Sequence, residues 1–200
     1  MDSDVRQMPQ VIAGQESQRI GQVWVVDAGV VVGGSLLMAV CAHVAVPLWF
    51  TPVPITLQTF GVMLLALTLG GWRAAAALVL YLLEGISGGP VFSPHGAGGA
   101  AQLFGPTGGY LMAYPFAALA GGWFAERFSS TSRYLALILG ALACDAIIFI
   151  GGAAGIFAVS HRPMASVITL AVLPFLPGEV LKGSAAIAAA LGKDKLRHRA

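Results

Sequence analysis

Apolar residues fill long segments of the chain, and short polar or glycine- and proline-rich connections separate them. A helix crosses a bilayer with about 20 mostly apolar residues, because lipid offers no partner to an unpaired backbone amide. The pattern therefore predicts an all-α integral membrane protein, a six-transmembrane-helix bundle within residues 23–192. The expected spans lie at about 28–47, 56–69, 74–86, 111–124, 134–159 and 165–191.

The composition agrees with this pattern and narrows the class of protein. Of the 200 residues, 57% are hydrophobic and 10% are charged, and the mean hydropathy is +0.81. A soluble domain carries roughly 25% charged residues. The net charge is only +2, and basic residues are not interleaved with aromatic ones to form a surface for nucleic acid. The lipid bilayer is the expected surrounding, and nucleic acid is not an expected partner.

The two ends of the chain are polar. Residues 1–22 lack the apolar core of a cleaved signal peptide and are predicted to form a flexible tail, and residues 193–200 form a basic tail. Positive residues accumulate on the cytoplasmic side of membrane proteins. With six spans, Arg162 faces outward and Lys182 lies in the membrane. The remaining Lys and Arg residues lie in the two tails and in the connections on the same side of the membrane as the tails, so both termini are predicted to be cytoplasmic. These residues are Arg6, Arg19, Arg73, Arg127, Arg133, Lys193, Lys195, Arg197 and Arg199.

Two unusual connections face the outside under this topology. Residues 46–54 contain three prolines, which cannot sustain a helix, and residues 87–102 are rich in Gly, Pro and Ser. Long connections of the second kind are often functional. Polar residues within or beside these connections are therefore expected to line one outward-facing cavity: Thr56, Gln58, His95, Gln102, Thr107 and Tyr110.

These polar residues also have simpler interpretations. His95 can be a solvated loop histidine, and Tyr110 can be an ordinary interfacial tyrosine. If the second span is helical from its start, Thr56 and Thr59 lie on one side and Gln58 on another. A buried Gln amide needs hydrogen-bond partners, which a ligand or a neighbouring helix can supply.

An acid and a base lie three residues apart in the last apolar segment. Glu179 and Lys182 follow the Pro177-Gly178 break, and hydrocarbon-like sequence surrounds them. A charged group in a membrane is costly and usually marks a pathway or a site. One alternative is a salt bridge that only neutralises two buried charges. Both can hold if the pair is preorganised before a ligand binds.

Several other residues have more than one interpretation. Asp145, in the fifth span, can pair with another helix, line the cavity or relay protons. The two cysteines, Cys41 and Cys144, are expected to be buried apolar residues rather than a disulfide or a metal site. The stretch around Ser87 matches G-x-S-x-G, but a nucleophile elbow needs a preceding strand, whereas an apolar helix is expected there.

The first span carries small residues at helical spacing. Ser35 and Ala39 lie four residues apart, so another helix can approach closely at this face. The partner can be a helix of the same chain or of another protein. Small residues at this spacing are common in membrane helices, so the sequence pattern alone favours internal packing.

Four ordered motifs resemble one known family. They are residues 50–60 (FTPVPITLQTF), 89–92 (GPVF), 105–111 (GPTGGYL) and 177–182 (PGEVLK). In these motifs the chain resembles the BioY family, the biotin-specific substrate-binding S components of energy-coupling factor (ECF) transporters. The resemblance covers roughly residues 35–191, and the two tails lie outside it.

The resemblance implies a six-helix fold of the ECF S-component type that binds biotin near its outer face. It implies that Glu179 and Lys182 hydrogen-bond the ligand, and that Ser35 and Ala39 dock a transmembrane T component. Two ATPase subunits would supply energy, since this chain contains no phosphate-binding G-x-x-x-x-G-K-[ST] motif. Neither a metal nor a cofactor is expected, and the protein is not expected to be an enzyme.

The chain departs from the family pattern at two places. Glu179 stands where members commonly have Asp. Some members place Asn and Arg around the third loop for the biotin carboxylate, and this chain offers His95, Gln102, Thr107 and Tyr110 instead. The apolar part of biotin suits an aromatic neighbourhood, which the sequence offers at Trp49, Phe50, Phe92 and Tyr110.

Two alternative functions remain at this point. One is a solitary vitamin carrier driven by an ion gradient, with Asp145 as a proton relay. The other is an intramembrane hydrolase that uses Ser87.

Overall fold

The computed structural model describes the backbone of residues 3–160 and 163–197, which is mostly helical. Arg162, assigned to the outer side above, and residues 198–200 of the basic tail lie outside the described residues. The elements are α1 (Ser3–His43), β1 (Ala45–Val46), β2 (Ile55–Thr56), α2 (Gln58–Leu69), α3 (Gly71–Ile86), the 3-10 helix η1 (Gly99–Phe104), α4 (Gly108–Arg127), α5 (Arg133–Ser160), α6 (Met164–Ala171) and α7 (Leu176–Arg197).

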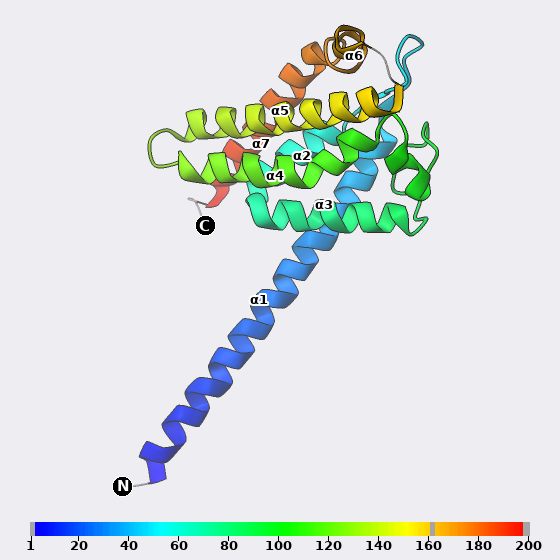
Figure 1. The fold of residues 1–200 in the computed structure, drawn as a ribbon. Coiled ribbons are helices and arrows are strands. Elements are labelled where there is room, and N and C mark those ends of the chain that lie inside the picture. Colours follow the sequence, from blue (N-terminus) through cyan, green and yellow to red (C-terminus); the bar gives the residue numbers. More distant parts are fainter. Residues whose placement is uncertain (1–2, 161–162, 198–200) are drawn as a thin grey trace.

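Helix α1 is much longer than the others and leaves the bundle as a single rod (Figure 1). It includes most of the stretch expected to be a flexible tail, and the division into tail and membrane domain stays a prediction. Where α1 approaches the bundle, large apolar side chains are exposed, including Trp24 at 71% and Val25 at 74%. Exposed apolar residues along a continuous helix are typical of a surface that faces lipid.

The connections expected on one side of the membrane gather at one end of the bundle. The residues between β1 and β2, the helix η1 and the helix α6 lie at the end opposite the C-terminus (Figure 1). The two short strands pair antiparallel, with Ala45 opposite Thr56. They close the proline-rich connection into a hairpin, which fixes its position above the helices.

Helix α2 begins later than the sequence pattern indicates. Thr56 belongs to β2, and the first helical residue is Gln58. The Thr56 hydroxyl accepts a hydrogen bond from the Gln58 backbone N–H at 3.2 Å. The expectation that Thr56 and Thr59 share a helix face apart from Gln58 is wrong, because helical spacing does not extend across the strand-to-helix junction.

Glycines allow α4 and α5 to pack closely. A Cβ atom added to Gly155 would lie 2.7 Å from the Gly109 Cα and 2.9 Å from its backbone nitrogen. On α5, Gly151 and Gly155 are four residues apart, the spacing of small residues that lets membrane helices approach. The α4–α5 pair therefore depends on the absence of side chains at this crossing.

The last apolar segment forms two helices rather than one. The segment 165–191 was expected to be a single span, but α6 and α7 are bent by 49° relative to each other. Pro174 lies at this break, where a proline removes a backbone donor and cannot continue a helix, and Pro177 lies in the first turn of α7, where proline is tolerated. The break places Phe175 and Glu179 side by side near the N-terminal end of α7.

The length and composition of the helices support a membrane protein. Two helical segments, Gly21–His43 and Arg133–Ser160, are long and apolar enough to cross a bilayer, and the bent pair α6 and α7 adds a third if it counts as one span. Helix α2 is apolar but shorter. The expected number of six spans is thus not confirmed by this criterion among the described residues.

Candidate functional site

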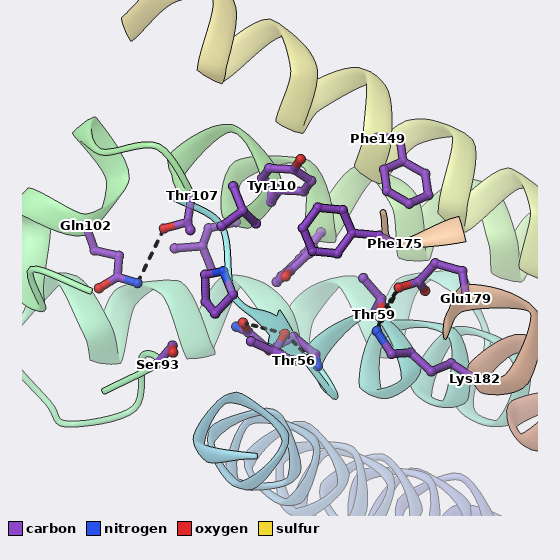
Figure 2. Close-up of a pocket in the computed structure, with 15 residues that line it drawn as sticks. Thr56, Thr59, Ser93, Gln102, Thr107, Tyr110, Phe149, Phe175, Glu179 and Lys182 are labelled. Atoms are coloured by element: carbon purple, nitrogen blue, oxygen red, sulfur yellow. Dashed lines mark hydrogen bonds and ion pairs between the residues drawn. The ribbon is translucent and has the colours of Figure 1, made fainter. Parts of the chain in front are cut away.

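A cavity lies at the end of the bundle where the connections gather. The space between its walls is about 510 Å³, including the part that is open to the surroundings. Its wall combines apolar and polar side chains from β2, α2, α4, α5, α7 and the connections between them (Figure 2). The lining residues are Val53, Pro54, Thr56, Gln58, Thr59, Ser93, Gln102, Thr107, Tyr110, Leu111, Tyr114, Phe149, Phe175, Glu179 and Lys182.

Glu179 and Lys182 form a charged group at one end of the cavity. The Lys182 Nζ lies 2.7 Å from Glu179 Oε1 and donates to the Thr59 hydroxyl at 2.9 Å. The Thr59 hydroxyl in turn donates to Glu179 Oε1 at 2.9 Å. The side chains of Glu179 and Lys182 are only 5% and 12% exposed. Helices α2 and α7 therefore hold one buried, hydrogen-bonded ion pair (Figure 2).

One oxygen of this ion pair has no protein partner. Glu179 Oε2 is buried and receives no hydrogen bond within the described part of the chain. Leaving a buried carboxylate oxygen without a hydrogen bond costs free energy, so such an atom usually accepts a hydrogen bond from the protein, from water or from a ligand. Because Glu179 lines the cavity, a ligand with an N–H or O–H group can supply the missing hydrogen bond.

Neutral polar groups line the opposite end of the cavity. The Gln102 amide donates to the Thr107 hydroxyl at 3.4 Å, and its carbonyl oxygen accepts the Gly98 N–H at 3.0 Å (Figure 2). The buried Ser93 hydroxyl has no partner among the described residues. This end can therefore offer weak donors and acceptors but no charge from the residues that line it.

His95 lies in an adjoining cavity rather than in the first one. The second cavity has an empty volume of about 550 Å³ and shares Pro54, Ser93, Gln102 and Thr107 with the first. The shared residues form the boundary between the two spaces. His95 therefore lies near the Gln102 end of the first cavity but does not line it.

The Gln58 amide is already bonded within the protein. Its Nε2 donates to the Tyr81 hydroxyl at 2.8 Å, and its Oε1 accepts from the Thr56 hydroxyl at 3.2 Å. A neighbouring helix, α3, thus supplies the partner that the sequence could not name. Gln58 and Thr56 form a fixed polar wall of the cavity.

Aromatic side chains from three segments form the apolar wall. Tyr110 and Tyr114 come from α4, Phe149 from α5, and Phe175 from the residues just before α7 (Figure 2). Among the aromatic residues expected here, only Tyr110 lines the cavity. Trp49 is 95% exposed, because it lies at the tip of the hairpin connection.

Two hydrogen bonds hold the end of α6 in place. The Tyr110 hydroxyl donates to the Ala171 carbonyl at 2.5 Å. From the hairpin connection, the Thr51 hydroxyl donates to the Leu170 carbonyl at 2.9 Å. The two bonds tie the end of α6 to α4 and to the hairpin connection, close to Phe175, which lines the cavity.

The change Tyr110→Phe is expected to lower the free energy of unfolding by about 1 kcal/mol, since it removes one buried hydrogen bond and leaves the Ala171 carbonyl unpaired. Thermal unfolding in detergent measures this change. Tyr134→Phe is the matched control, because Tyr134 is 63% exposed. Equal stability of the two variants would contradict a role for Tyr110 in holding α6.

The structure brings together most of the residues that were predicted to bind a ligand. Glu179, Lys182, Tyr110, Gln58, Thr107, Thr56 and Gln102 line the first cavity, and His95 lines the second. Sequence reasoning did not assign Thr59, Ser93, Tyr114, Phe149 or Phe175 to the site. Thr59 could have been assigned to the site from the sequence, because it lies in the same motif as Thr56 and Gln58.

The residues predicted to dock a partner lie on α1, away from the cavity. Ser35 is fully buried and donates to Glu84 of α3, while Ala39 is partly exposed. The Ser35 side chain thus faces α3 within the chain, in agreement with the alternative of internal packing. A docking role for this face stays a prediction.

The sequence matches the model of one known protein family. The model of the BioY family matches residues 15–199, almost the whole sequence. The chain belongs to the BioY family. The match extends beyond the range of 35–191 that the four sequence motifs indicated.

Relatives in the BioY family agree with this match. The chain is 36% identical to the biotin transporter BioY of Thermotoga maritima, over 80% of this chain and 90% of the relative. It is 34% identical to the biotin transporter BioY of Rhizobium etli, over 74% of this chain and 80% of the relative. A crystal structure of the S-component for biotin from an ECF-type ABC transporter superposes with a TM-score of 0.76 at 27% identity, covering 88% of this chain and 93% of that one.

BioY-family membership does not favour either alternative function. The relatives are described as transporters rather than enzymes. Ser87 follows the end of α3, and its hydroxyl donates to the Leu83 carbonyl at 2.8 Å. A serine that a helix precedes is not in a nucleophile elbow. The hydrolase hypothesis therefore has neither the structural setting nor the family relationship that it requires.

Proposed function

We propose that this chain is a biotin-binding subunit for biotin uptake, and that biotin occupies the cavity with its ureido ring at the Glu179–Lys182 end. The observation that carries the proposal is the buried, unpaired Oε2 of Glu179. The ureido ring presents two N–H donors and one carbonyl acceptor. Glu179 Oε2 can accept from an N–H, and the third hydrogen of the Lys182 ammonium can reach the carbonyl.

The remaining parts of biotin fit the other walls of the cavity. The sulfur-containing ring and the valeryl chain of biotin are apolar and would pack against Tyr110, Phe149 and Phe175. The valeryl carboxylate would then point toward Gln102 and Thr107, where the two cavities meet. This orientation keeps the ligand carboxylate away from Glu179, so that two negative charges do not meet.

The proposal includes the topology expected from the sequence. Helices α1, α2, α3, α4 and α5 and the bent pair α6 and α7 would form six spans with both termini in the cytoplasm. The distribution of Lys and Arg supports this topology, and so does the similarity to an S-component for biotin. The cavity would then open to the outside of a prokaryotic cell membrane.

Energy for uptake would come from partner proteins. A transmembrane T component and two ATPase subunits of an ECF module would complete the transporter, because the chain has no P-loop sequence of its own. Ala39 and the exposed residues beside it on α1 are the candidate surface for the T component. Biotin would be the transported ligand, without any chemical step on it.

Equilibrium binding to the purified chain tests the biotin proposal. Biotin is expected to bind in the nanomolar to micromolar range, about −8 to −12 kcal/mol. Desthiobiotin, which keeps the ureido group, should compete, whereas lipoic acid, which has a carboxylate tail but no ureido group, should not. The proposal fails if biotin does not bind, or if lipoic acid competes as well as desthiobiotin.

A further inference from the structure

A second acid lies beside the proposed ureido site. Asp145 on α5 is one helical turn from Phe149, which lines the cavity. The Asp145 carboxyl lies within hydrogen-bonding reach of the Glu179 carboxyl on α7. Its Oδ1 is buried and receives no hydrogen bond from the described part of the chain, and the same holds for Glu179 Oε2. Two neighbouring helices thus bring together two carboxyl groups, each with one unsatisfied oxygen.

A shared proton accounts for both oxygens at once. Two ionised carboxylates in contact repel each other, and a buried pair of this kind retains one proton. A protonated carboxyl has an O–H donor, which would satisfy the oxygen of its neighbour. With one proton on the pair and a positive charge on Lys182, the buried group has no net charge, which a membrane interior favours.

The surroundings of Asp145 offer few other groups that can compensate its charge. From α7, Glu179 and Lys182 face it, and from α4 the phenol of Tyr114 lies near Glu179. Its neighbour on α5 is Cys144, whose thiol donates to the Ala117 carbonyl at 3.3 Å. Helices α2 and α6 contain no charged residue. Lys182 is therefore the cation that can balance these two acids within the described residues.

We propose that Asp145 and Glu179 hold one proton between them, and that biotin binds to this protonated form. The proposal rests on the function proposed above and adds a proton as a second bound species. In the protonated form, the Asp145 hydroxyl donates to Glu179 Oε2, and the second lone pair of this oxygen accepts the ureido N–H. If the proton leaves to solvent, the pair gains a negative charge and both acids compete for Lys182.

The direction of the pH effect follows from this balance. Biotin binding to the unprotonated site requires uptake of one proton, so affinity is highest at low pH and falls as the pair loses its proton. The steepest expected fall is tenfold per pH unit, the limit for linkage to one proton. The biotin carboxylate does not contribute above about pH 6, because an alkyl carboxylic acid is fully ionised there.

The test compares the wild-type chain with Asp145→Asn across a range of pH. The Asn amide can donate to Glu179 but cannot lose its proton. The wild-type affinity is expected to fall between about pH 6.5 and about pH 9.5, as the pair loses its shared proton. At the lowest pH of this range, the affinity of Asp145→Asn for biotin is expected to lie within about tenfold of the wild-type affinity. Its affinity should not fall as the pH rises.

Calorimetry and a second variant sharpen this comparison. At the alkaline end, titrations in buffers with different heats of ionisation should report uptake of about one proton per biotin for wild type, and none for Asp145→Asn. His95→Gln should keep the wild-type pH profile, because His95 lines the other cavity. A flat wild-type profile, or the same fall in Asp145→Asn, would overturn the proposal, and so would loss of the fall in His95→Gln.

A measurement without biotin separates this inference from the proposed function. Infrared difference spectroscopy of the empty protein between low and high pH should contain the C=O band of a protonated carboxyl, which Asp145→Asn should remove. If the band is present and biotin does not bind, the shared proton stands and the biotin proposal fails. If biotin binds but the band is missing, the shared proton is wrong and the biotin site stands.

Discussion

Lys182→Met is expected to lower biotin affinity by at least about 100-fold, which corresponds to about 2.7 kcal/mol. The ammonium donates to Glu179 Oε1 and to the Thr59 hydroxyl, and it is the cation that lines the cavity in the described structure. Its removal leaves the Glu179 carboxylate without a counter-charge and takes away the proposed donor to the ureido carbonyl. Equilibrium binding of biotin to the purified variant measures the loss.

The same substitution should also destabilise the protein. Breaking a buried ion pair by removing one partner costs about 3–5 kcal/mol, because an uncompensated charge remains. Weaker binding of Lys182→Met could thus reflect a damaged fold rather than a lost ligand contact. A variant that removes both charges separates the two causes.

The double variant Glu179→Gln with Lys182→Met leaves no charge on this pair. Replacing a whole buried ion pair by neutral groups is often nearly neutral for stability. We expect the double variant to recover most of the stability lost in Lys182→Met and still to bind biotin at least about 100-fold more weakly than wild type. Recovery of biotin binding together with stability would show that the ion pair serves only the fold.

The sequence predicted the residues of the site that lie in short local motifs. The acid and base at 179 and 182 are on one side of a helix because three residues make nearly one turn, and the structure places them 2.7 Å apart. Gln102, Thr107 and Tyr110 lie near the start of α4, and the sequence marks this start with glycines and a proline. Local signals of this kind do not depend on how the helices pack.

Contacts between distant segments could not be predicted in the same way. The hydrogen bonds of Thr59 with Glu179 and Lys182 join residues separated by more than a hundred positions, and nothing in either motif specifies this pairing. Phe149 is one of many apolar residues on α5, and its place at the cavity depends on how α5 is rotated. The three alternatives for Asp145 likewise depend on the position of α7, which the sequence around Asp145 does not specify.

The helix boundaries differ from expectation where hydropathy carries little information. Residues 165–191 are mostly apolar, so the hydropathy pattern merges α6 and α7, although Pro174 interrupts the backbone between them. Hydropathy also does not indicate that α1 begins at Ser3, well before the first apolar span, because hydropathy detects burial in lipid and not helix formation. In both places, the length of an apolar segment does not report where the backbone hydrogen bonds of a helix begin and end.

The close approach of α4 and α5 leads to a second large expected effect. Gly155→Leu should lower the free energy of unfolding by about 3 kcal/mol, because its Cβ would lie within 3 Å of backbone atoms of Gly109, which cannot move without separating the helices. The α4–α5 pair carries Thr107, Tyr110 and Phe149, so biotin affinity should fall as well. Chemical unfolding in detergent and biotin binding measure the two effects.

Gly29→Leu is the matched control for this substitution. Gly29 is also in a helix, but a Cβ atom there would meet nothing within 4 Å. Leucine favours a helix over glycine by roughly 0.5–1 kcal/mol, so the control should be as stable as wild type or slightly more stable. The difference between the two variants therefore measures the steric cost at the helix crossing without the gain in helix propensity. If Gly155→Leu were as stable as Gly29→Leu and kept its biotin affinity, α4 and α5 would not need this close contact to form the site.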